Sequence, residues 1–459
     1  MTDDYDVVVV GAGTGGYSCA LRAAQLGKRV ALIEREDRLG GTCLLRGCIP
    51  TKALLQSAAV LDTVNRSQEW GITASGEPDW PAIRTFEEKI VDKLVSGLTS
   101  LLSMRKVDVV HGSATLVAGP AVQVGGRTIA ATDVVIATGS RPRLLPEVQV
   151  TDRIITSDQA LWYPTIPTSA VVIGAGAVGL EFASFYRSMG ATVTLLEALP
   201  TIAPLEDEDI AKEVARAFRK RGIESFAGSR VQSVDDQGGA VKVAYEVGGE
   251  TKNTAADVCL IAVGRGPVSE DLGLEDAGIE LDRGFVKVDG QLQTTASHVW
   301  AIGDVAATPL QLAHVSFTEG IAVAERISGL AVPDIDYVGI PRVTYCTPEI
   351  ASVGLTQAQA VERGHEVDVE KLNFRAIGKA DIVGEGGLVK VVAEKDGGPV
   401  LGVHMVGPHV TDLIAEAMLI TNWEAAPAEV AALIHPHPTL SEAIGEAHLA
   451  LAGKPLHTA

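Results

Sequence analysis

The stretch VVVVGAGTGG, residues 7–16, places an apolar strand directly before a glycine-rich turn, and it recurs as AVVIGAGAVG at residues 170–179. Both copies carry a G-x-G-x-x-G pattern at one constant offset, with no gap. In a strand–turn–helix unit such glycines allow a tight turn and a close approach of the backbone to a pyrophosphate, and the helix N-terminus favours its negative charge. The repeat therefore predicts two dinucleotide-binding units. Their glycines are Gly11, Gly13, Gly16, Gly174, Gly176 and Gly179.

Each unit closes on a second apolar strand that ends in an acid. RVALIE ends at Glu34, and TVTLLE ends at Glu197. An acid at this place accepts a hydrogen bond from a ribose hydroxyl, and two copies in register favour an α/β fold with two nucleotide sites. The Glu197 carboxylate would repel a 2′-phosphate, and the ALPTIAP that follows contains no lysine or arginine to receive one. This favours NAD over NADP in the second unit.

The stretch GGTCLLRGCIP, residues 40–50, holds Cys43 and Cys48, two of only five cysteines in the chain. An undistorted helix would place their Cα atoms about 8.6 Å apart, beyond the roughly 7 Å that a disulfide spans. A bond between them therefore requires a bent segment, and the three glycines of the stretch allow one. Two buried thiols are the alternative. Zinc is disfavoured because no second ligand pair follows.

Composition narrows the class of protein. The chain has 459 residues, 46% of them hydrophobic, and 48 glycines, which fits a compact α/β protein with several cores. A formal net charge of −20 argues against general nucleic-acid binding and leaves room for a basic protein partner. We find neither a secretory signal in the acidic start nor an apolar run that could span a bilayer, so we expect a cytoplasmic protein that is not in the membrane. Sparse, odd-numbered cysteines favour a catalytic over a structural bond.

A set of motifs in a fixed order resembles the flavoprotein disulfide reductases, and within them the dihydrolipoamide dehydrogenase family, over essentially the whole chain. The motifs are GGTCLLRGCIPTKALL, ATGSRP, GAGAVGLEFAS, AVGRGP, AIGDV, LAHVSFTEG, PRVTYCTPEIASVGLT and HPHPTLSEA. The resemblance implies two Rossmann-like domains, for FAD and NAD, and a C-terminal α+β dimerisation domain. The boundaries we predict are 1–148 for the FAD domain, 149–268 for the NAD domain, 269–338 for a central segment that returns to the FAD domain, and 339–459 for the dimerisation domain.

The resemblance also assigns roles around the cysteines. Cys43 would meet the substrate and Cys48 would face the flavin, in a redox disulfide. Lys52 would stand at the isoalloxazine ring with Glu181 as its ion-pair partner; a solvated lysine and an ordinary helical glutamate are the alternative. The first glycine turn and Glu34 would hold FAD together with further residues: Ala114 at the adenine, Thr138 and Gly139 at a strand end, Asp304 on the sugar chain and Ala313 nearby. Val231 and Gly264 would contact NAD, although both could be core residues.

The C-terminal HPHPTLSEA supplies candidates for proton transfer, because a dithiol must lose a proton before it attacks a disulfide. By resemblance His437 is the base and Glu442 orients its ring. The alternative is a capping box, Thr439 to Glu442, that opens a helix. His435 we interpret as structural.

The function implied is oxidation of protein-bound dihydrolipoamide. His437 would deprotonate a substrate thiol, the thiolate would attack Cys43 to give a mixed disulfide, and Cys48 would pass two electrons to FAD and then NAD. The chain would act as a homodimer, the E3 component of 2-oxoacid dehydrogenase complexes, and would meet the lipoyl and docking domains of an acyltransferase (E2).

Enzymes with related activities have sequence features that differ from those of this chain. Glutathione reductase normally has basic residues where ALPTIAP lies in this chain. Mercuric reductase usually has a C-terminal cysteine pair, whereas no cysteine follows Cys346 here. Soluble transhydrogenase would be expected to lack the pair that Cys43 and Cys48 form. A non-enzymatic FAD scaffold would not need these cysteines together with His437. Arg46, beside the cysteines, could lower a thiol pKa or line the entrance.

Overall fold

The computed structural model describes residues 3–457, so residues 1–2 and 458–459, the ends of the predicted outer domains, lie outside the described residues. The chain forms two compact units. The first unit comprises Met1–Ala53, Pro81–Arg143 and Arg265–Tyr337, and the second comprises Leu54–Trp80, Leu144–Gly264 and Val338–Ala459.

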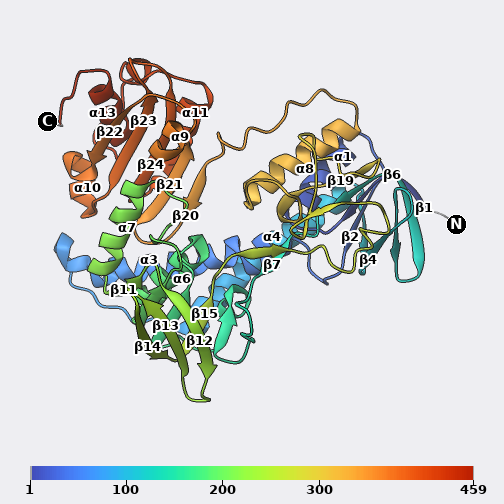
Figure 1. Cartoon of the computed structure of the whole chain (residues 1–459), viewed down its shortest axis with the longest axis horizontal. Helices are drawn as coiled ribbons and strands as arrows, with labels where there is room; N and C mark the ends of the chain where they lie inside the picture. The colour runs from blue at the N-terminus through green and yellow to red at the C-terminus, as the bar shows by residue number, and fades with distance from the viewer. Residues whose placement is uncertain (1–2, 458–459) are drawn as a thin grey trace. The chain divides into compact units, whose positions relative to one another are not determined.

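A seven-stranded sheet forms the centre of the first unit. Its strands lie in the order β3-β2-β1-β6-β5-β4, and β19 also pairs with β6. The pairs β1–β2, β2–β3, β1–β6 and β6–β19 are parallel, whereas β4 and β5 form an antiparallel hairpin against the start of β6. The bounds are β1 (Asp3–Val10), β2 (Val30–Glu34), β3 (Asp108–His111), β4 (Ala114–Val117), β5 (Ala121–Val124), β6 (Arg127–Ile136) and β19 (Val299–Ala301). Figure 1 shows β6, β1 and β2 beside α1.

Helices cover this sheet because its central strands are apolar on both faces. Val7 and Val9 pack with α1 (Thr14–Gln25), which follows the first glycine turn, and with α8 (Ala313–Ile327). The two helices approach closely at Gly320, where a Cβ atom would stand 2.4 Å from the carbonyl oxygen of Gly15. The unit also contains α2 (Gly41–Arg46), the first turn of α3 (Cys48–Asn65), most of α4 (Trp80–Met104) and the strand pair β7 (Ser140–Pro142) and β16 (Arg265–Pro267).

The second unit holds the repeat of this arrangement. A parallel five-stranded sheet has the order β11-β10-β9-β15-β8, and an antiparallel sheet β12-β13-β14 packs beside it through a shared core that includes Val171, Val243 and Tyr245. The bounds are β8 (Ile154–Thr156), β9 (Ser169–Ile173), α6 (Ala177–Ser188), β10 (Thr192–Leu196), α7 (Glu208–Lys220), β11 (Ile223–Phe226), β12 (Arg230–Asp236), β13 (Val241–Val247), β14 (Glu250–Ala256) and β15 (Val258–Ile261).

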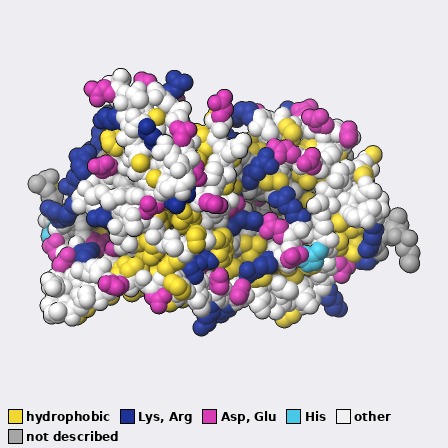
Figure 2. Space-filling view, turned by 90° about the horizontal axis from the view of Figure 1, so that it is seen from below, with side chains coloured by type: hydrophobic (Ala, Val, Ile, Leu, Met, Phe, Trp, Pro, Cys, Tyr) yellow, Lys and Arg dark blue, Asp and Glu magenta, His cyan; other side chains and the backbone are white. Residues whose placement is uncertain are grey.

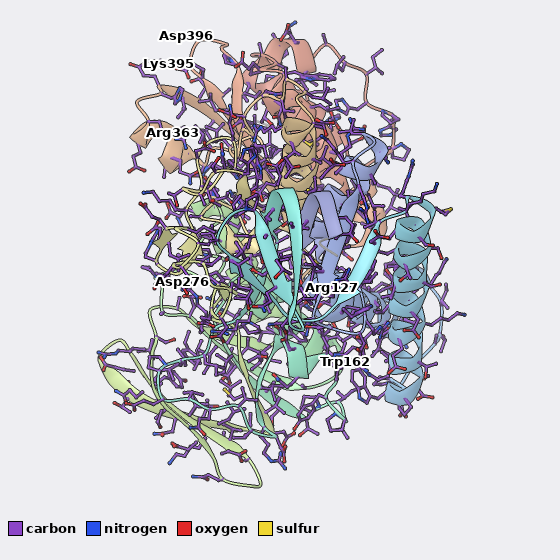
Figure 3. The ribbon with its side chains drawn as sticks, turned by 90° about the vertical axis from the view of Figure 1, so that its right-hand side faces the viewer. Arg127, Trp162, Asp276, Arg363, Lys395 and Asp396 are labelled. Atoms are coloured by element: carbon purple, nitrogen blue, oxygen red, sulfur yellow. The ribbon has the colours of Figure 1, made fainter. Side chains whose placement is uncertain are left out.

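The C-terminal part of the second unit is an antiparallel sheet in the order β20-β21-β24-β23-β22. Apolar residues on its inner face, such as Val391 and Val403, pack against α11 and α13. Lys395 and Asp396, labelled in Figure 3, lie in the turn between β23 and β24. The bounds are β20 (Arg342–Thr344), β21 (Glu349–Gly354), α9 (Gln357–Glu362), β22 (Val367–Asn373), α10 (Gly378–Val383), β23 (Leu388–Glu394), β24 (Val400–Gly407), α11 (Val410–Asn422), α12 (Pro427–Val430) and α13 (Glu442–Leu451).

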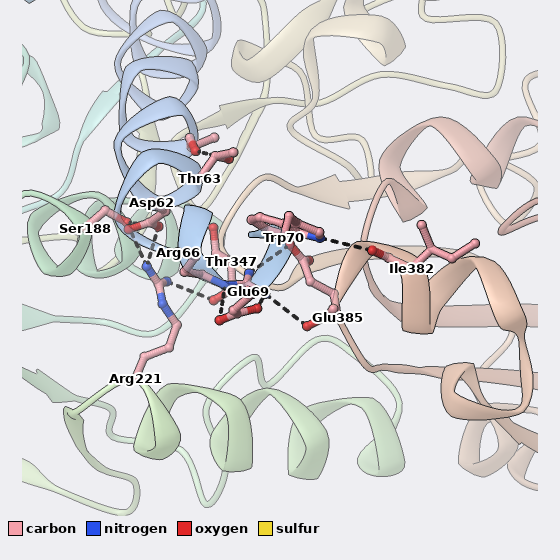
Figure 4. Close-up of polar contacts among 12 residues, drawn as sticks. Asp62, Thr63, Arg66, Glu69, Trp70, Ser188, Arg221, Thr347, Ile382 and Glu385 are labelled. Atoms are coloured by element: carbon pink, nitrogen blue, oxygen red, sulfur yellow. Dashed lines mark hydrogen bonds and ion pairs between the residues drawn. The ribbon is translucent and has the colours of Figure 1, made fainter. Parts of the chain in front are cut away.

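Arg221, at the end of α7, ties together several segments of the second unit (Figure 4). Its guanidinium donates hydrogen bonds to Asp62 of α3, to Ser188 of α6 and to the carbonyl oxygen of Thr347, at 3.2, 2.7 and 3.0 Å. Burial lowers the pKa of this guanidinium, although Asp62 opposes the shift. Because one half-buried cation supplies several donors, its loss would leave several acceptors unpaired at once.

Short elements complete the fold: η1 (Ser67–Trp70), α5 (Ser157–Ala160), β17 (Leu281–Asp282), β18 (Phe285–Val286), η2 (Gly303–Val305) and η3 (Phe374–Ala376). Among the described residues no helix is both long and apolar enough to cross a membrane. On the face shown in Figure 2, Lys and Arg side chains lie among those of Asp and Glu.

Candidate functional site

The first glycine turn has two packed positions and one open position. Gly11 has a φ of +105°, and a Cβ atom there would stand 2.4 Å from the carbonyl oxygen of Ala137. At Gly16 a Cβ atom would be 1.8 Å from the carbonyl oxygen of Gly11. At Gly13 the nearest atom would be 3.9 Å away, on Gly41. The outer glycines therefore serve the fold, while the middle one leaves room for a ligand.

The second turn repeats this geometry. A Cβ atom at Gly174, whose φ is +104°, would stand 2.3 Å from the carbonyl oxygen of Ala262, and one at Gly179 would stand 1.8 Å from the carbonyl oxygen of Gly174. A Cβ atom at Gly176 would meet nothing within 4 Å. Each turn thus forms a cradle that a side chain would fill, as a bound pyrophosphate requires.

The two acids brace these turns. Glu34 accepts hydrogen bonds from the backbone N–H groups of Ala12, at 2.8 Å, and Glu36, at 3.1 Å. Glu197 accepts from Ala175, at 2.7 Å, and from the residue two positions after it, Leu199, at 2.8 Å. Both acids are buried. Because each carboxylate oxygen has a second lone pair, each acid can also accept a hydrogen bond from a ribose hydroxyl.

The cysteine segment is bent, as a bond between Cys43 and Cys48 would require. Helix α2 ends before Gly47, whose φ and ψ are −145° and −113°, and α3 begins at Cys48. At the other end Gly40 has a φ of +118°. In the structure no disulfide joins Cys43 and Cys48, and a hydrogen bond links their side chains.

The surroundings of Cys43 shift the pKa of its thiol in opposite directions. The hydrogen bond with Cys48 and burial raise the pKa of Cys43, and Asp304 raises it further. Lys52, one helical turn after Cys48 on α3, lowers it. Lys52 is therefore placed to stabilise a thiolate at this pair.

Asp304 is held by a network that the sequence analysis did not identify. Ser140 donates a hydrogen bond to its Oδ2 at 2.5 Å, and Arg265 donates to the Ser140 hydroxyl at 2.6 Å and to the Ser140 carbonyl oxygen at 2.7 Å. Both partners stand inside quoted motifs, ATGSRP and AVGRGP, and that is the only signal that could have found them.

A buried acid holds the turn that carries Asp304. Glu319, on α8, is fully buried and accepts hydrogen bonds from the backbone N–H of Gly303, at 2.6 Å, and from the hydroxyl of Tyr337, at 2.8 Å. Burial raises the pKa of Glu319. This residue was also missed, although the LAHVSFTEG motif contains it.

The other residues predicted for the first site lie in the first unit. Thr138 donates a hydrogen bond to the carbonyl oxygen of Val268 at 2.6 Å, and Gly139 has a φ of +74° with open space where a Cβ would stand. Ala114 begins β4 and is buried, and Ala313 begins α8. Their contacts with a cofactor stay predictions.

In the second unit, Gly264 has a φ of +104° and open space at its Cβ position, whereas Val231, on β12, packs against the core beneath β13. Glu181 is buried on α6 and accepts a hydrogen bond from the N–H of Tyr345 at 2.9 Å. Its pairing with Lys52 stays a prediction.

His437 and Glu442 come together as predicted. Nδ1 of His437 lies 2.8 Å from Oε1 of Glu442, and Oε2 of Glu442 accepts from the N–H of Thr439 at 2.8 Å. Burial raises the pKa of Glu442, but the Thr439 N–H and His437 outweigh it and bring the pKa below its usual value. The capping box is incomplete, because α13 begins only at Glu442 and its N-cap, Ser441, makes no side-chain cap bond.

His437 and its neighbour His435 have different surroundings. The His437 side chain is 77% exposed and that of His435 only 13%. Nε2 of His435 lies 2.6 Å from Oε1 of Glu416 on α11, and this contact raises the pKa of His435. The ring packs over Gly445, so His435 joins α11 to α13, consistent with a structural role.

Arg46 pairs with a carboxylate. Its guanidinium contacts both oxygens of Glu36. The two roles left open for Arg46 both stay predictions.

Comparison with known proteins agrees with this geometry. A family model described as pyridine nucleotide-disulphide oxidoreductase matches residues 5–320, and the model of that family's dimerisation domain matches residues 340–448. The chain belongs to the pyridine nucleotide-disulphide oxidoreductase family, and the predicted fold class is confirmed.

Relatives within that family narrow the match. Dihydrolipoyl dehydrogenases of Bacillus subtilis (strain 168) and Zymomonas mobilis are each 42% identical to the chain, with 100% of both chains covered. This confirms the resemblance read from the motifs. Among solved structures, LpdA from Mycobacterium tuberculosis has a TM-score of 0.89 at 27% identity, and a Cu(II) complex of the HOCl-induced flavoprotein disulfide reductase RclA from Escherichia coli has 0.88 at 28%. In both comparisons the matched region covers 98% of this chain and 100% of the other chain.

Proposed function

We propose that the chain oxidises protein-bound dihydrolipoamide to lipoamide and passes two electrons through Cys43 and Cys48 and through FAD to NAD+. The observation that carries this proposal is the bent cysteine segment, with two hydrogen-bonded thiols beside Lys52. The names of the full-length relatives support the substrate.

The two glycine cradles fit the two dinucleotides. The first turn, Glu34, Lys52 and Asp304 would hold FAD, and the second turn with Glu197 would hold NAD+. When bound, the two cofactors supply the redox chemistry that takes two electrons and one proton from the dithiol as it returns to a disulfide, and the other proton leaves to solvent.

The chain's own residues carry out the thiol exchange. In the oxidised protein Cys43 and Cys48 would be joined by a disulfide. His437 takes the proton of one substrate thiol, and the resulting thiolate attacks Sγ of Cys43, so that the Cys43–Cys48 bond breaks and Cys48 leaves as a thiolate. The second substrate thiol then loses its proton and displaces Cys43, which closes the lipoamide ring. Two electrons and two protons pass from substrate to the cysteine pair.

The His437–Glu442 contact prepares the base. With Nδ1–H donated to the Glu442 carboxylate, Nε2 of His437 is the nitrogen left to accept a proton. The lowered pKa of Glu442 keeps that carboxylate charged, so that it can accept the Nδ1–H of His437. The charge on Lys52 favours the thiolate form of the cysteine pair.

The active assembly is a homodimer, which the dimerisation domain supports. We propose that His437 of one subunit completes the Cys43–Cys48 site of the other, since its ring is exposed on its own chain. We further propose that the dimer acts in the cytoplasm as the E3 component of 2-oxoacid dehydrogenase complexes and docks on their acyltransferase core. The net charge of −20 suits a basic docking domain.

Replacing Cys43 tests the proposal. Cys43→Ser removes the sulfur that the substrate attacks, so dihydrolipoamide:NAD+ activity should vanish while FAD remains bound through the separate glycine turn. The control is Cys259→Ala, which changes a thiol buried in the second unit and should keep activity. Substantial lipoamide activity in Cys43→Ser would refute the cysteine relay.

A further inference from the structure

The segment after Glu197, residues 198–207, forms a loop, called here the nucleotide loop, that touches the second glycine turn. Leu199 donates its N–H to Glu197, and Ala203 donates its N–H to the carbonyl oxygen of Ala175, inside the turn, at 3.1 Å. The carbonyl oxygen of Leu199 accepts from the N–H of Gly228 at 2.8 Å. These bonds join the nucleotide loop to the second glycine turn and to the residues beside it.

The far end of the nucleotide loop is bound by a buried lysine of the C-terminal sheet. Asp207 is the N-cap of α7, and Lys390, on β23, donates hydrogen bonds to Asp207 at 2.8 Å and to Asp209 at 2.6 Å. The Lys390 side chain is 2% exposed and that of Asp207 is 3% exposed. Burying an ion pair this completely requires close geometry, since either charge alone would be costly.

Further contacts from β20 and from the start of α9 reach the same end of the loop. Arg342, on β20, donates to the carbonyl oxygen of Leu205 at 3.3 Å and lies 3.7 Å from Oε2 of Glu206. The same guanidinium nitrogen donates to Ser352 of β21 at 3.1 Å, which fixes its position on the sheet. The N–H of Gln357 donates to Asp207 at 3.2 Å.

From these contacts we propose that Lys390 and Arg342 are positioning residues for nucleotide binding, which hold the nucleotide loop, and through it the glycine turn, in the conformation that accepts NAD+. The inference rests on the proposed function. Neither residue lies in the strand–turn–helix repeat: both belong to the segment that matches the dimerisation domain. The dimerisation domain therefore helps to set the affinity of the nucleotide site.

The chain offers a matched control. Lys371, on β22, donates to the same carboxylate, that of Asp209, at 3.1 Å, but its side chain is 51% exposed and it has no bond to Asp207. Lys371→Met should leave NAD+ affinity unchanged, whereas Lys390→Met should weaken it by about fivefold or more. Arg342→Lys removes the guanidinium that donates to the loop while it keeps the positive charge. It should also weaken NAD+ affinity, and it leaves no buried carboxylate unpaired.

The experiment measures NAD+ binding to the FAD-loaded dimers by isothermal titration calorimetry, and steady-state kinetics with both substrates. For Lys390→Met and Arg342→Lys we expect a higher Kd and KM for NAD+ with an unchanged KM for dihydrolipoamide. If Lys390→Met fails to fold, the NAD+ affinity of Arg342→Lys tests the inference. Variants that are less stable but bind NAD+ like wild type would overturn the inference and leave the proposed function intact. Wild-type protein that does not bind NAD+ would overturn both.

Discussion

The open position of each glycine turn allows a substitution that separates folding from ligand binding. Gly176 and Gly179 stand three residues apart in the second turn, and the structure gives them opposite surroundings: nothing within 4 Å of a Cβ at Gly176, and a carbonyl oxygen 1.8 Å away at Gly179. We therefore expect alanine at the two positions to have different effects.

Gly176→Ala should leave the fold nearly unchanged. Gly176 has a φ of −74°, which alanine adopts freely. It is the N-cap of α6, where alanine is worse than glycine by about 1 kcal/mol, while a stiffer unfolded chain returns about 0.4–1 kcal/mol. The free energy of unfolding should thus change by less than about 1 kcal/mol. The methyl group would occupy the space meant for the pyrophosphate, so the Kd for NAD+ should rise at least about tenfold, or about 1.4 kcal/mol.

Gly179→Ala should instead disturb the fold. Its Cβ would lie at about half the ordinary contact distance from the carbonyl oxygen of Gly174, which belongs to the backbone and cannot rotate away. Helix α6 would have to shift, at a cost of about 3 kcal/mol or more. Thermal unfolding without nucleotide, followed by calorimetric titration with NAD+, measures both effects. Wild-type NAD+ affinity in Gly176→Ala would refute the assignment of the open glycine to the pyrophosphate, and wild-type stability in Gly179→Ala would refute the packing argument.

Three other predictions concern charge and symmetry. Replacing Glu197 with Ala should narrow the preference for NAD+ over NADP+, measured as kcat/KM for each, and equal efficiency with both in the wild type would contradict the role of this acid. Dimers that combine a Cys43→Ser subunit with a His437→Gln subunit, isolated by two tags, should have about half of wild-type activity; inactive mixed dimers that still bind FAD would rule out a shared site. Burial raises the pKa of Glu87 to about 7 from 4.5, so the folded state holds this proton more tightly, and the free energy of unfolding should fall, by on the order of 3 kcal/mol, as the pH rises from about 4.5 through 7. Urea denaturation should show that fall and its loss in Glu87→Gln; equal pH dependence in the two proteins would contradict it.

The glycine repeat could be predicted because it is a local pattern, and the histidine–glutamate pair could be predicted from the family resemblance. The bend could be predicted only as the condition that a bond between the two cysteines would require. Glycines at a fixed spacing favour a tight turn whatever the rest of the chain does. Gly47, between the two cysteines, allows the helix to break there. The His437–Glu442 contact spans only five residues.

The supporting contacts could not be predicted, because they join residues that are far apart in sequence. Ser140 bonds Asp304 across 164 positions, and Lys390 bonds Asp207 across 183. No spacing rule connects such pairs, and their geometry depends on how sheets and loops pack. The helix start at Glu442 was also ambiguous, since Thr439 to Glu442 has the spacing of a capping box although only one of its two bonds forms.

The proposed electron exchange between dihydrolipoamide and NAD+ runs through Cys43 and Cys48. It is tested most directly by anaerobic thiol labelling of the FAD-loaded protein, in which labelled cysteines are located by mass spectrometry before and after each substrate is added. Cys19 and Cys259 serve as internal controls, because burial raises the pKa of each thiol to about 12. We predict that dihydrolipoamide makes both Cys43 and Cys48 available to the label and that excess NAD+ then protects both again. Labelling of these two cysteines that does not respond to either substrate would contradict it.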